Sequence, residues 1–348
     1  MKGKSLKLKP VSDKPYNAET PFAALHSKVT PADLVYVRNH FDVPSLDINQ
    51  FSLKINDSAA NQNELSIEQL KKFPERDLHV VMECAGNGRA SMTPTIKSTP
   101  WNLGAISQTR FTGTSLHNIL EAVGYPKDAI EVRFTGMDQG KVRSGGTAQY
   151  ARSLPLEVAL HEDTILAWKM NGEPLPLQHG FPLRLVVPNL YGMASVKWLG
   201  EITVLTEPFE GFFQTKEYVY VGEDGTADET PVSNIRVRSL ILEPADGLAI
   251  KNDIIEVSGL AWTGKGTITK VEISFDQGTQ WIEAKIEPPT SPYGTYRWKH
   301  LWSPKSAGRY AITARAYDSE GNVQPLDSRW NKGGYGNNVV HQLKLSII

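Results

Sequence analysis

The chain has 348 residues, with 37 basic side chains, 38 acidic side chains and a single cysteine. This length predicts two domains, each able to bury a core. The near balance of charge argues against a protein that binds nucleic acids in general or acidic membranes, because both functions need a basic face. A single cysteine excludes an internal disulfide, which fits a reducing compartment.

Residues 1–30 are polar and contain several prolines, so we expect an extended arm at the N-terminus. The first ten residues are basic but lack the apolar region of a signal peptide, and no apolar run reaches membrane-spanning length. We therefore expect a cytoplasmic protein for the chain as given, and a periplasmic one if this is a processed form. No nucleic-acid partner and no membrane span are expected.

A run of polar side chains follows the first predicted core segment. Pro31 is typical of the first position of a helix, and residues 35–37 form an apolar run that predicts a short strand. Arg38, Asn39 and His40 come next, as that run ends. Three such groups in a row indicate contact with an anion or a cofactor, and the alternative is a solvated loop.

Two short elements lead to the central segment of the chain. Residues 47–53 alternate in character and predict a strand, and residues 66–73 predict a short helix with Ser66 as its N-cap. Residues 78–83 are largely apolar and predict a buried strand that ends at Cys84.

Cys84 is followed by Ala85, then by Gly-Asn-Gly at residues 86–88 and by Arg89, so the one thiol of the chain stands between a rigid strand and a tight loop. A fixed strand end sets the direction of the sulfur, and positive surroundings lower the pKa of a thiol. This arrangement suits a thiolate metal ligand. The alternative is a small buried hydrophobic residue, which is the usual state of an isolated cysteine.

The rest of the first half alternates between short helices and strands. Its predicted elements are helices at residues 114–123 and 154–160 and strands at residues 130–134 and 165–170. Gly124 is a typical helix stop, and Asp138 lies in a glycine-containing loop after its strand. Asn171 and Gly172 favour a type I′ hairpin turn.

Two cations lie within apolar sequence farther along the chain. His179 precedes an apolar run that contains Arg184, and Lys197 lies in the segment of residues 195–200. A positive charge in an apolar segment is costly to bury unless it is paired. Arg184 and Lys197 therefore need a shared anion or a nearby carboxylate, and the alternative for each is a surface position on an edge strand.

After about residue 232 the pattern changes to short runs with period-two alternation, separated by turns. These runs are residues 254–257, 270–275, 280–284, 311–317 and 341–345. They predict an antiparallel, immunoglobulin-like β-sandwich without a core disulfide. We therefore predict an α+β fold, with a mixed α/β catalytic domain at residues 1–232 and a β-sandwich domain at residues 233–348.

Five segments, in the family's order, resemble the sulfite oxidase family of molybdenum enzymes. The most specific is Cys-Ala-Gly-Asn at residues 84–87, which matches the signature whose cysteine coordinates molybdenum. The others are Arg-Asn-His at residues 38–40, His-Gly-Phe-Pro at 179–182 with Arg184, Ser-Val-Lys-Trp-Leu-Gly at 195–200, and a C-terminal domain with Asn-Val-Gln-Pro at 322–325 and Trp-Asn at 330–331. The resemblance covers almost the whole chain and implies a molybdopterin-binding domain followed by an Ig-like dimerisation domain.

The resemblance implies that Cys84 is the thiolate ligand of molybdenum, which also carries the dithiolene of one molybdopterin and oxo or hydroxo groups. The residues that it places around the cofactor are Tyr36, Val37, Arg38, Asn39, His40, Asp138, His179, Arg184, Ser195, Val196 and Lys197. The pterin ends in a phosphate, which buried cations and loop amides can hold, and this phosphate is the anion that Arg184 and Lys197 need. We expect Arg89 to belong to the same set.

The resemblance also implies roles in catalysis. Arg38 faces a small oxyanion beside the metal, and the hydroxyl of Tyr218 hydrogen-bonds the substrate or the equatorial oxygen; the alternative for Tyr218 is a core or interface residue. His300 stands where the family often has a second arginine, so we expect an anion pocket whose charge depends on pH. Gly88 stands where many animal and plant members have arginine, which removes one possible phosphate contact and is typical of bacterial members.

The implied reaction is the oxidation of sulfite to sulfate by oxygen-atom transfer in a homodimer. The chain has no haem-binding motif, so we expect electrons to pass to an external acceptor, either a c-type cytochrome or oxygen. One alternative is another oxyanion oxidoreductase on the same scaffold, such as a nitrate reductase or a subunit of a sulfur-oxidising complex. The other is a non-catalytic Ig-like binding protein, which would contain no molybdenum.

Overall fold

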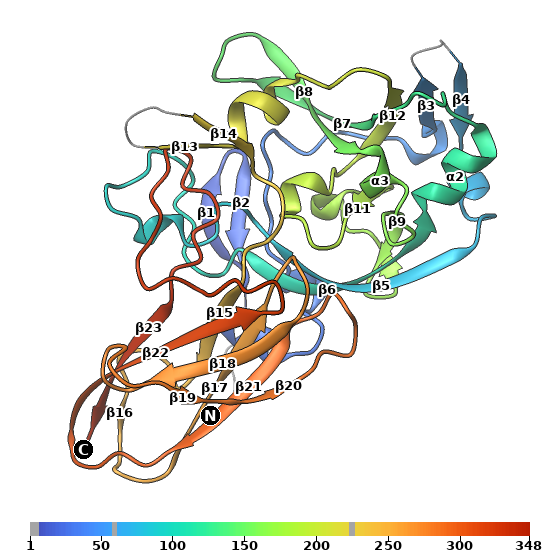
Figure 1. The fold of residues 1–348 in the computed structure, drawn as a ribbon. Coiled ribbons are helices and arrows are strands. Elements are labelled where there is room, and N and C mark those ends of the chain that lie inside the picture. Colours follow the sequence, from blue (N-terminus) through green and yellow to red (C-terminus); the bar gives the residue numbers. More distant parts are fainter. Residues whose placement is uncertain (1–6, 58–60, 223–226) are drawn as a thin grey trace.

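The computed structural model describes residues 7–57, 61–222 and 227–348, so the first six residues of the predicted arm lie outside the described part. Figure 1 shows a larger N-terminal body of sheets and short helices beside an elongated C-terminal body of strands. The α+β fold class is confirmed. No helix among the described residues is long and apolar enough to cross a membrane.

The N-terminal body contains two five-stranded sheets. The first runs in the order β10-β9-β6-β5 with β11 also on β9, and its strands are β5 (Glu75–Glu83), β6 (Ile106–Ser115), β9 (Ile165–Met170), β10 (Glu173–Pro174) and β11 (Arg184–Val186). The second runs in the order β4-β3-β12-β7-β8, and its strands are β3 (Leu53–Asp57), β4 (Gln62–Leu65), β7 (Glu131–Lys141), β8 (Thr147–Pro155) and β12 (Leu199–Leu205). Pairing is antiparallel throughout, except that β3 and β12 are parallel.

The local signals of the helices and of one hairpin are confirmed. Ser66 caps α1 (Ile67–Leu70) in a capping box with Gln69. Helix α2 (Leu116–Val123) buries Leu116, Ile119 and Leu120, whose spacing puts them on one face, and it ends at Gly124, which has a positive φ of 79°. Helix α3 (Leu156–Ala159) covers part of the third predicted helix. Asn171 and Gly172 both have positive φ and join β9 to β10.

Several predictions of local structure were wrong. Residues 35–37 do not form a strand, and Val37 makes an isolated bridge with Ala18. Asp138 lies within β7 and not in a loop after it, because β7 continues through the glycine-containing stretch to Lys141. Residues 47–53 form a short 3-10 helix (Ile48–Gln50) in place of a strand, because the side chain of Asp47 accepts a hydrogen bond from the N–H of Asn49 and favours a turn. The described part of the arm is a hairpin of β1 (Lys9–Asp13) and β2 (Tyr16–Glu19), followed by a 3-10 helix (Phe22–His26).

The remaining short elements connect the sheets. They are the 3-10 helices Ala32–Leu34, Arg89–Ser91, Leu177–His179 and Gly192–Ala194, the π-helical turn Phe213–Glu217, and the hairpin of β13 (Val219–Val221) and β14 (Ala227–Pro231).

The C-terminal body is the predicted β-sandwich, with one four-stranded and one five-stranded sheet. The first has the order β15-β17-β21-β20: β15 (Arg238–Glu243), β17 (Ile255–Trp262), β21 (Tyr296–Trp302) and β20 (Lys285–Glu287). The second has the order β16-β23-β22-β18-β19: β16 (Ala249–Ile250), β23 (His341–Ile347), β22 (Gly308–Asp318), β18 (Ile268–Ser274) and β19 (Ile282–Glu283). A separate apolar core fills the space between them.

The sandwich packs against the edge of the first sheet of the N-terminal body, at strand β5 (Figure 1). The N–H of Val81 donates to the carbonyl of Tyr293 (2.7 Å), and the hydroxyl of Ser291 donates to the carbonyl of His79 (2.7 Å). A loop of the sandwich therefore covers an edge strand that would otherwise leave its backbone groups unpaired. This contact also joins the sandwich to the strand that carries Cys84.

Candidate active site

Segments that are far apart in the sequence meet around a cavity at the end of β5. It is lined by Val35, Tyr36, Arg38, Asn39, His40, Met82, Cys84, Phe111, Asp138, Tyr150, His179, Arg184, Gly192, Met193, Ser195, Lys197, Trp198 and Tyr218. Met82 and Cys84 both line it, because alternate residues of an extended chain point to the same side. Glu83, which lies between them, points to the other side and does not line the cavity.

The backbone around Cys84 is held by hydrogen bonds. The N–H of Cys84 donates to the carbonyl of Ala105 (2.9 Å), and the carbonyl of Cys84 accepts from the N–H of Asn87 (2.9 Å). Gly86 leaves no room for a side chain, because a Cβ there would lie 2.6 Å from the guanidinium of Arg89. The sulfur is therefore presented to the cavity from a fixed loop.

Burial raises the pKa of the Cys84 thiol, while Arg38, Arg89 and the N–H of Gly86 act in the opposite direction. This corrects the prediction that positive surroundings lower this pKa, because Cys84 is almost fully buried and desolvation of the thiolate outweighs its neighbouring cations. A metal ion at the sulfur reverses the balance, since a coordinating thiol loses its proton.

Two cations inside the N-terminal body face the cavity without an ion pair. Arg184 donates to the carbonyls of His179 (2.9 Å) and Ser195 (3.2 Å), and Lys197 donates to the side chain of Asn39 and to the carbonyl of Gln178 (2.9 Å). Neither cation lies within 4.0 Å of a carboxylate in the described part of the chain. Both side chains line the cavity, and Arg184 is buried, so neither has the surface position on an edge strand that was the alternative.

The titration of these groups reflects a buried excess of positive charge. Burial lowers the pKa of Arg184 to about 10, and burial together with Arg184 lowers the pKa of Lys197. Burial raises the pKa of Asp138 to about 6, and Oδ1 of Asp138 is buried without a hydrogen-bond partner among the described residues. The cavity therefore suits a ligand that carries both anionic groups and N–H donors.

An aromatic wall borders the cavity on the side of Tyr218. The Tyr218 hydroxyl and Nε2 of His40 share a hydrogen bond of 2.7 Å, and the His40 ring stacks on Tyr150 with centroids 4.7 Å apart. Burial, followed by Arg38, Lys197 and Arg152, lowers the pKa of His40 well below its usual value, so this imidazole is neutral. Burial raises the pKa of Tyr218 to about 12, so its hydroxyl keeps its proton near neutral pH.

Most of the predicted site residues line this one cavity. Those that do are Tyr36, Arg38, Asn39, His40, Cys84, Asp138, His179, Arg184, Ser195, Lys197 and Tyr218. Val37 and Val196 are buried beside it and do not line it: Val37 pairs with Ala18, and the carbonyl of Val196 accepts from Leu185.

Arg89 also lies outside the cavity lining, with its guanidinium against Gly86 of the Cys84 loop. It donates to the carbonyls of Gly333 (2.8 Å) and Thr99 (3.0 Å), and its guanidinium lies over the ring of Tyr335 at 5.2 Å. Its charge acts on the Cys84 thiol, whose pKa it lowers against the effect of burial.

His300 corrects our prediction of a second anion-binding residue. It lies on β21 in the sandwich, opposite Val257, and its ring packs near Phe275 at 6.0 Å. It does not line the cavity, because strand pairing within the sandwich determines its position.

We therefore expect His300→Ala to leave kcat and KM within about twofold of the wild-type values, as for a substitution away from the reacting groups. Steady-state kinetics of the purified variant checks this. A tenfold or larger fall in kcat/KM would return His300 to the active site.

Several lining residues were missed from the sequence. Tyr150 comes from β8, which reaches the cavity by pairing with β7, and Phe111 comes from the middle of β6. Met82 lies two residues before Cys84, so strand alternation could have found it. Tyr150 and Phe111 carry no local signal, since their positions depend on sheet pairing.

Comparisons with known proteins agree with this geometry. Residues 40–213 match the model of the oxidoreductase molybdopterin binding domain, and residues 229–348 match that of the Mo-co oxidoreductase dimerisation domain. Mitochondrial sulfite oxidase of Homo sapiens is 34% identical over 98% of this chain and 66% of its own length. Sulfite oxidase of Arabidopsis thaliana is 33% identical over 98% of this chain and 94% of its own length.

The chain is also similar to proteins that are named for other reactions. Inducible nitrate reductase [NADH] 2 of Glycine max is 30% identical over 96% of this chain and 41% of its own length. The solved structure of the sulfane dehydrogenase SoxCD from Paracoccus pantotrophus superposes with a TM-score of 0.85 at 26% identity, covering 98% of this chain and 90% of that one.

The chain spans about two thirds of the length of the mitochondrial relatives that it matches. Its two matched domains lie in the order that the sequence predicts, and Cys84 lies in a cavity with the charge and donor set of an anionic pterin site. The chain therefore belongs to the sulfite oxidase family of molybdopterin-dependent oxidoreductases, and molybdenum bound to molybdopterin is its cofactor.

Proposed function

We propose that this protein oxidises sulfite to sulfate and passes the electrons to an external acceptor, a c-type cytochrome or oxygen. In the balanced reaction sulfite gains one oxygen atom from water, and two electrons and two protons are released. The observation that carries the proposal is a buried, positively charged cavity at Cys84, which is bordered by a protonated tyrosine and a neutral histidine. Sulfite is a small dianion that such a cavity attracts.

The residues of the cavity fit the cofactor. Cys84 is the one thiolate ligand that the chain can supply, and Arg184 and Lys197 are the cations that would hold anionic groups of the pterin. The unpartnered carboxylate oxygen of Asp138 would accept a hydrogen bond from an N–H donor of the pterin ring. When bound, the molybdenum centre supplies the oxygen-atom transfer and accepts the two electrons.

The other residues act on the substrate. Nη1 of Arg38 donates to the side chain of Asn17 and to the carbonyl of Asn39. The other two nitrogens of the guanidinium can therefore face an oxyanion. Tyr218 is protonated and can donate to a substrate oxygen when its hydroxyl turns from His40. Both groups favour negative charge on the oxygens of the substrate and its product.

A second candidate is another oxyanion or sulfur reaction at the same site. The likeness to a nitrate reductase and to a sulfane dehydrogenase favours it, because those relatives carry different activities on this scaffold. We also propose that the chain forms a homodimer through its β-sandwich, on the basis of the match to a dimerisation domain.

The function is tested with purified holoprotein. We expect molybdenum in a stoichiometric amount with the chain, sulfite-dependent reduction of ferricyanide or cytochrome c, and no nitrate-dependent oxidation of reduced viologen. Nitrate reduction without sulfite turnover, or turnover of a sulfane compound alone, would overturn the proposal in favour of the second candidate. A protein that binds no molybdenum when produced with the cofactor would overturn both.

A further inference from the structure

A buried ion pair lies directly behind Cys84, on the side away from the cavity. Nη1 of Arg238 donates to Oε1 of Glu83 at 2.8 Å, and each side chain is only 2% exposed. Arg238 belongs to β15 of the sandwich, whereas Glu83 is the last residue of β5. The pair thus joins the two domains through the residue next to Cys84.

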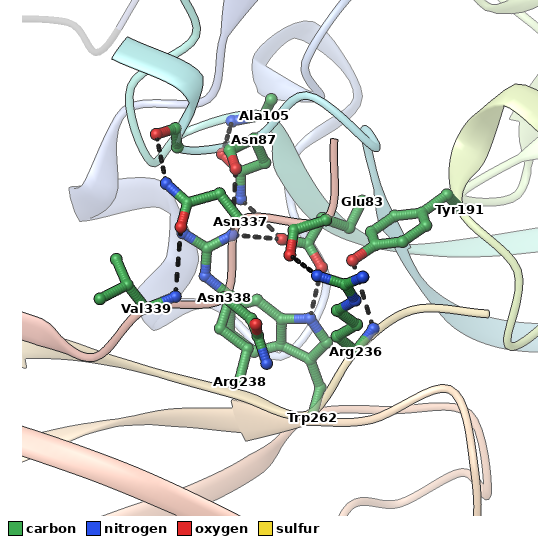
Figure 2. Close-up of polar contacts among 12 residues, drawn as sticks. Glu83, Asn87, Ala105, Tyr191, Arg236, Arg238, Trp262, Asn337, Asn338 and Val339 are labelled. Atoms are coloured by element: carbon green, nitrogen blue, oxygen red, sulfur yellow. Dashed lines mark hydrogen bonds and ion pairs between the residues drawn. The ribbon is translucent and has the colours of Figure 1, made fainter. Parts of the chain in front are cut away.

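Both oxygens of the Glu83 carboxylate are held. Oε1 also accepts from the side chain of Asn87 (2.9 Å), and Oε2 accepts from the indole N–H of Trp262 (2.9 Å), so Glu83 lies between two side chains of the sandwich and the turn after Cys84 (Figure 2). Nη1 of Arg238 also donates to the carbonyl of Asn87 (3.3 Å). This set of Glu83, Asn87, Arg238 and Trp262 is called the Glu83 cluster below.

Each charge of the Glu83–Arg238 pair depends on the other for its neutralisation. Nε and Nη2 of Arg238 are buried without a hydrogen-bond partner among the described residues, and Glu83 is the one carboxylate within 4.0 Å of this guanidinium there. If either charge is removed, the other is left buried without a counter-charge. The local structure must then rearrange or admit water, and because Glu83 is covalently joined to Cys84, such a rearrangement displaces the backbone that carries the sulfur.

Contacts of Gly88 and of the C-terminal segment at residues 336–337 also join the Cys84 loop to the sandwich domain. Gly88 has φ of 84°, and a Cβ there would lie 2.9 Å from Nη2 of Arg238. The side chain of Asn337 donates to the carbonyl of Gly88 (2.8 Å), and the N–H of Gly336 donates to the carbonyl of Ala85 (2.8 Å). The Cys84 loop is therefore tied to the C-terminal domain on both sides of the cluster.

We infer that Glu83 and Arg238 are positioning residues for the metal ligand, so that the β-sandwich sets the direction of the Cys84 sulfur. An ion pair that served stability alone could lie anywhere in the domain interface. This one is attached to the residues on both sides of Cys84, and side chains that orient a metal ligand affect metal affinity and reactivity. The inference rests on the proposed function only in taking Cys84 as the ligand, and it does not depend on which substrate is turned over.

The test compares Glu83→Gln, Arg238→Met and the double variant with Glu272→Gln, a control at the ion pair of Glu272 with Arg315 (2.7 Å) in the sandwich. Each holoprotein is analysed for molybdenum content, for the rate of cofactor loss on dilution and for the EPR spectrum of Mo(V) after reduction with dithionite. These measurements need no substrate, so they remain informative if sulfite is not the substrate.

For both single variants we expect an altered Mo(V) spectrum and cofactor loss that is about 10- to 100-fold faster, the usual range for residues that orient a metal ligand. The double variant should recover thermal stability, because it leaves no unpaired charge, without recovering the wild-type spectrum. The control should keep the wild-type spectrum and cofactor retention.

If the Glu83→Gln protein fails to fold, Trp262→Phe removes one hydrogen bond to Oε2 and keeps an aromatic ring, and it should produce the same spectral change to a smaller extent. The inference is overturned if the variants lose only thermal stability and keep wild-type molybdenum content, cofactor retention and Mo(V) spectrum. That result would assign the pair to domain packing.

Discussion

Replacing Cys84 with serine is expected to lower sulfite-dependent turnover by about 10³-fold or more, which corresponds to about 4 kcal/mol of transition-state stabilisation. Serine at this position presents a hydroxyl, which is a harder and far less acidic group than a thiol, so the metal loses its soft thiolate donor. Cys84 faces the cavity and is the single cysteine of the chain, so no other thiol can take its place. The measurement is the steady-state rate of ferricyanide reduction at saturating sulfite.

The Cys84→Ser protein should remain folded, because the backbone hydrogen bonds of the loop do not involve the sulfur. Ala284→Ser is a suitable control: Ala284 is 4% exposed in the sandwich, so it also buries a new hydroxyl, but far from the cavity. Thermal unfolding and pterin content of both variants separate loss of the ligand from loss of the fold. Full activity of Cys84→Ser would show that the ligand assignment is wrong.

Replacing Arg38 with methionine is expected to reduce kcat/KM for sulfite by about 30-fold. This factor corresponds to the loss of one hydrogen bond between charged groups, which contributes roughly 2 kcal/mol. Arg38 lies in the cavity close enough to Cys84 and Tyr218 to interact electrostatically with both. Methionine keeps most of the volume of the side chain and removes its charge. We expect a higher KM, because a dianion loses the guanidinium that attracts it into the cavity.

Arg38→Lys should recover part of this loss, since lysine restores the charge but not the planar set of donors. Arg309→Met removes an exposed arginine from β22 in the sandwich and serves as the matched control, with kinetics expected to match the wild type. Rates at several sulfite concentrations give kcat and KM separately. An unchanged kcat/KM in Arg38→Met would exclude this residue from substrate binding.

The structure links these two predictions to the domain interface. Cys84 faces the substrate side, and Glu83 on the opposite side of the same backbone is held by Arg238 and Trp262 of the sandwich (Figure 2). The sandwich therefore supports the backbone that carries Cys84, in addition to its role in the proposed dimer. A substitution at this interface is expected to affect the metal ligand Cys84 more than it affects the substrate-binding residues Arg38 and Tyr218.

Local sequence rules were reliable where a few neighbouring residues decide the outcome. The capping box at Ser66, the apolar spacing and Gly124 stop of α2, and the Asn171–Gly172 turn each depend on contacts within about four residues. The same rules failed at residues 47–53, where the hydrogen bond that the side chain of Asp47 accepts from the N–H of Asn49 outweighed a weak alternation of residue types.

By itself, the sequence determined the α+β fold class, the strand that leads to Cys84, and the presence of two cations, Arg184 and Lys197, within apolar segments. Only the tertiary structure decided which side chains meet. It brought His40 and Tyr218 within 2.7 Å across 178 residues, moved His300 out of the site, and paired Glu83 with Arg238 across 155 residues. The physical reason is that residue type and spacing determine local backbone geometry, whereas contacts over such separations depend on sheet pairing and domain packing, which no short stretch of sequence encodes.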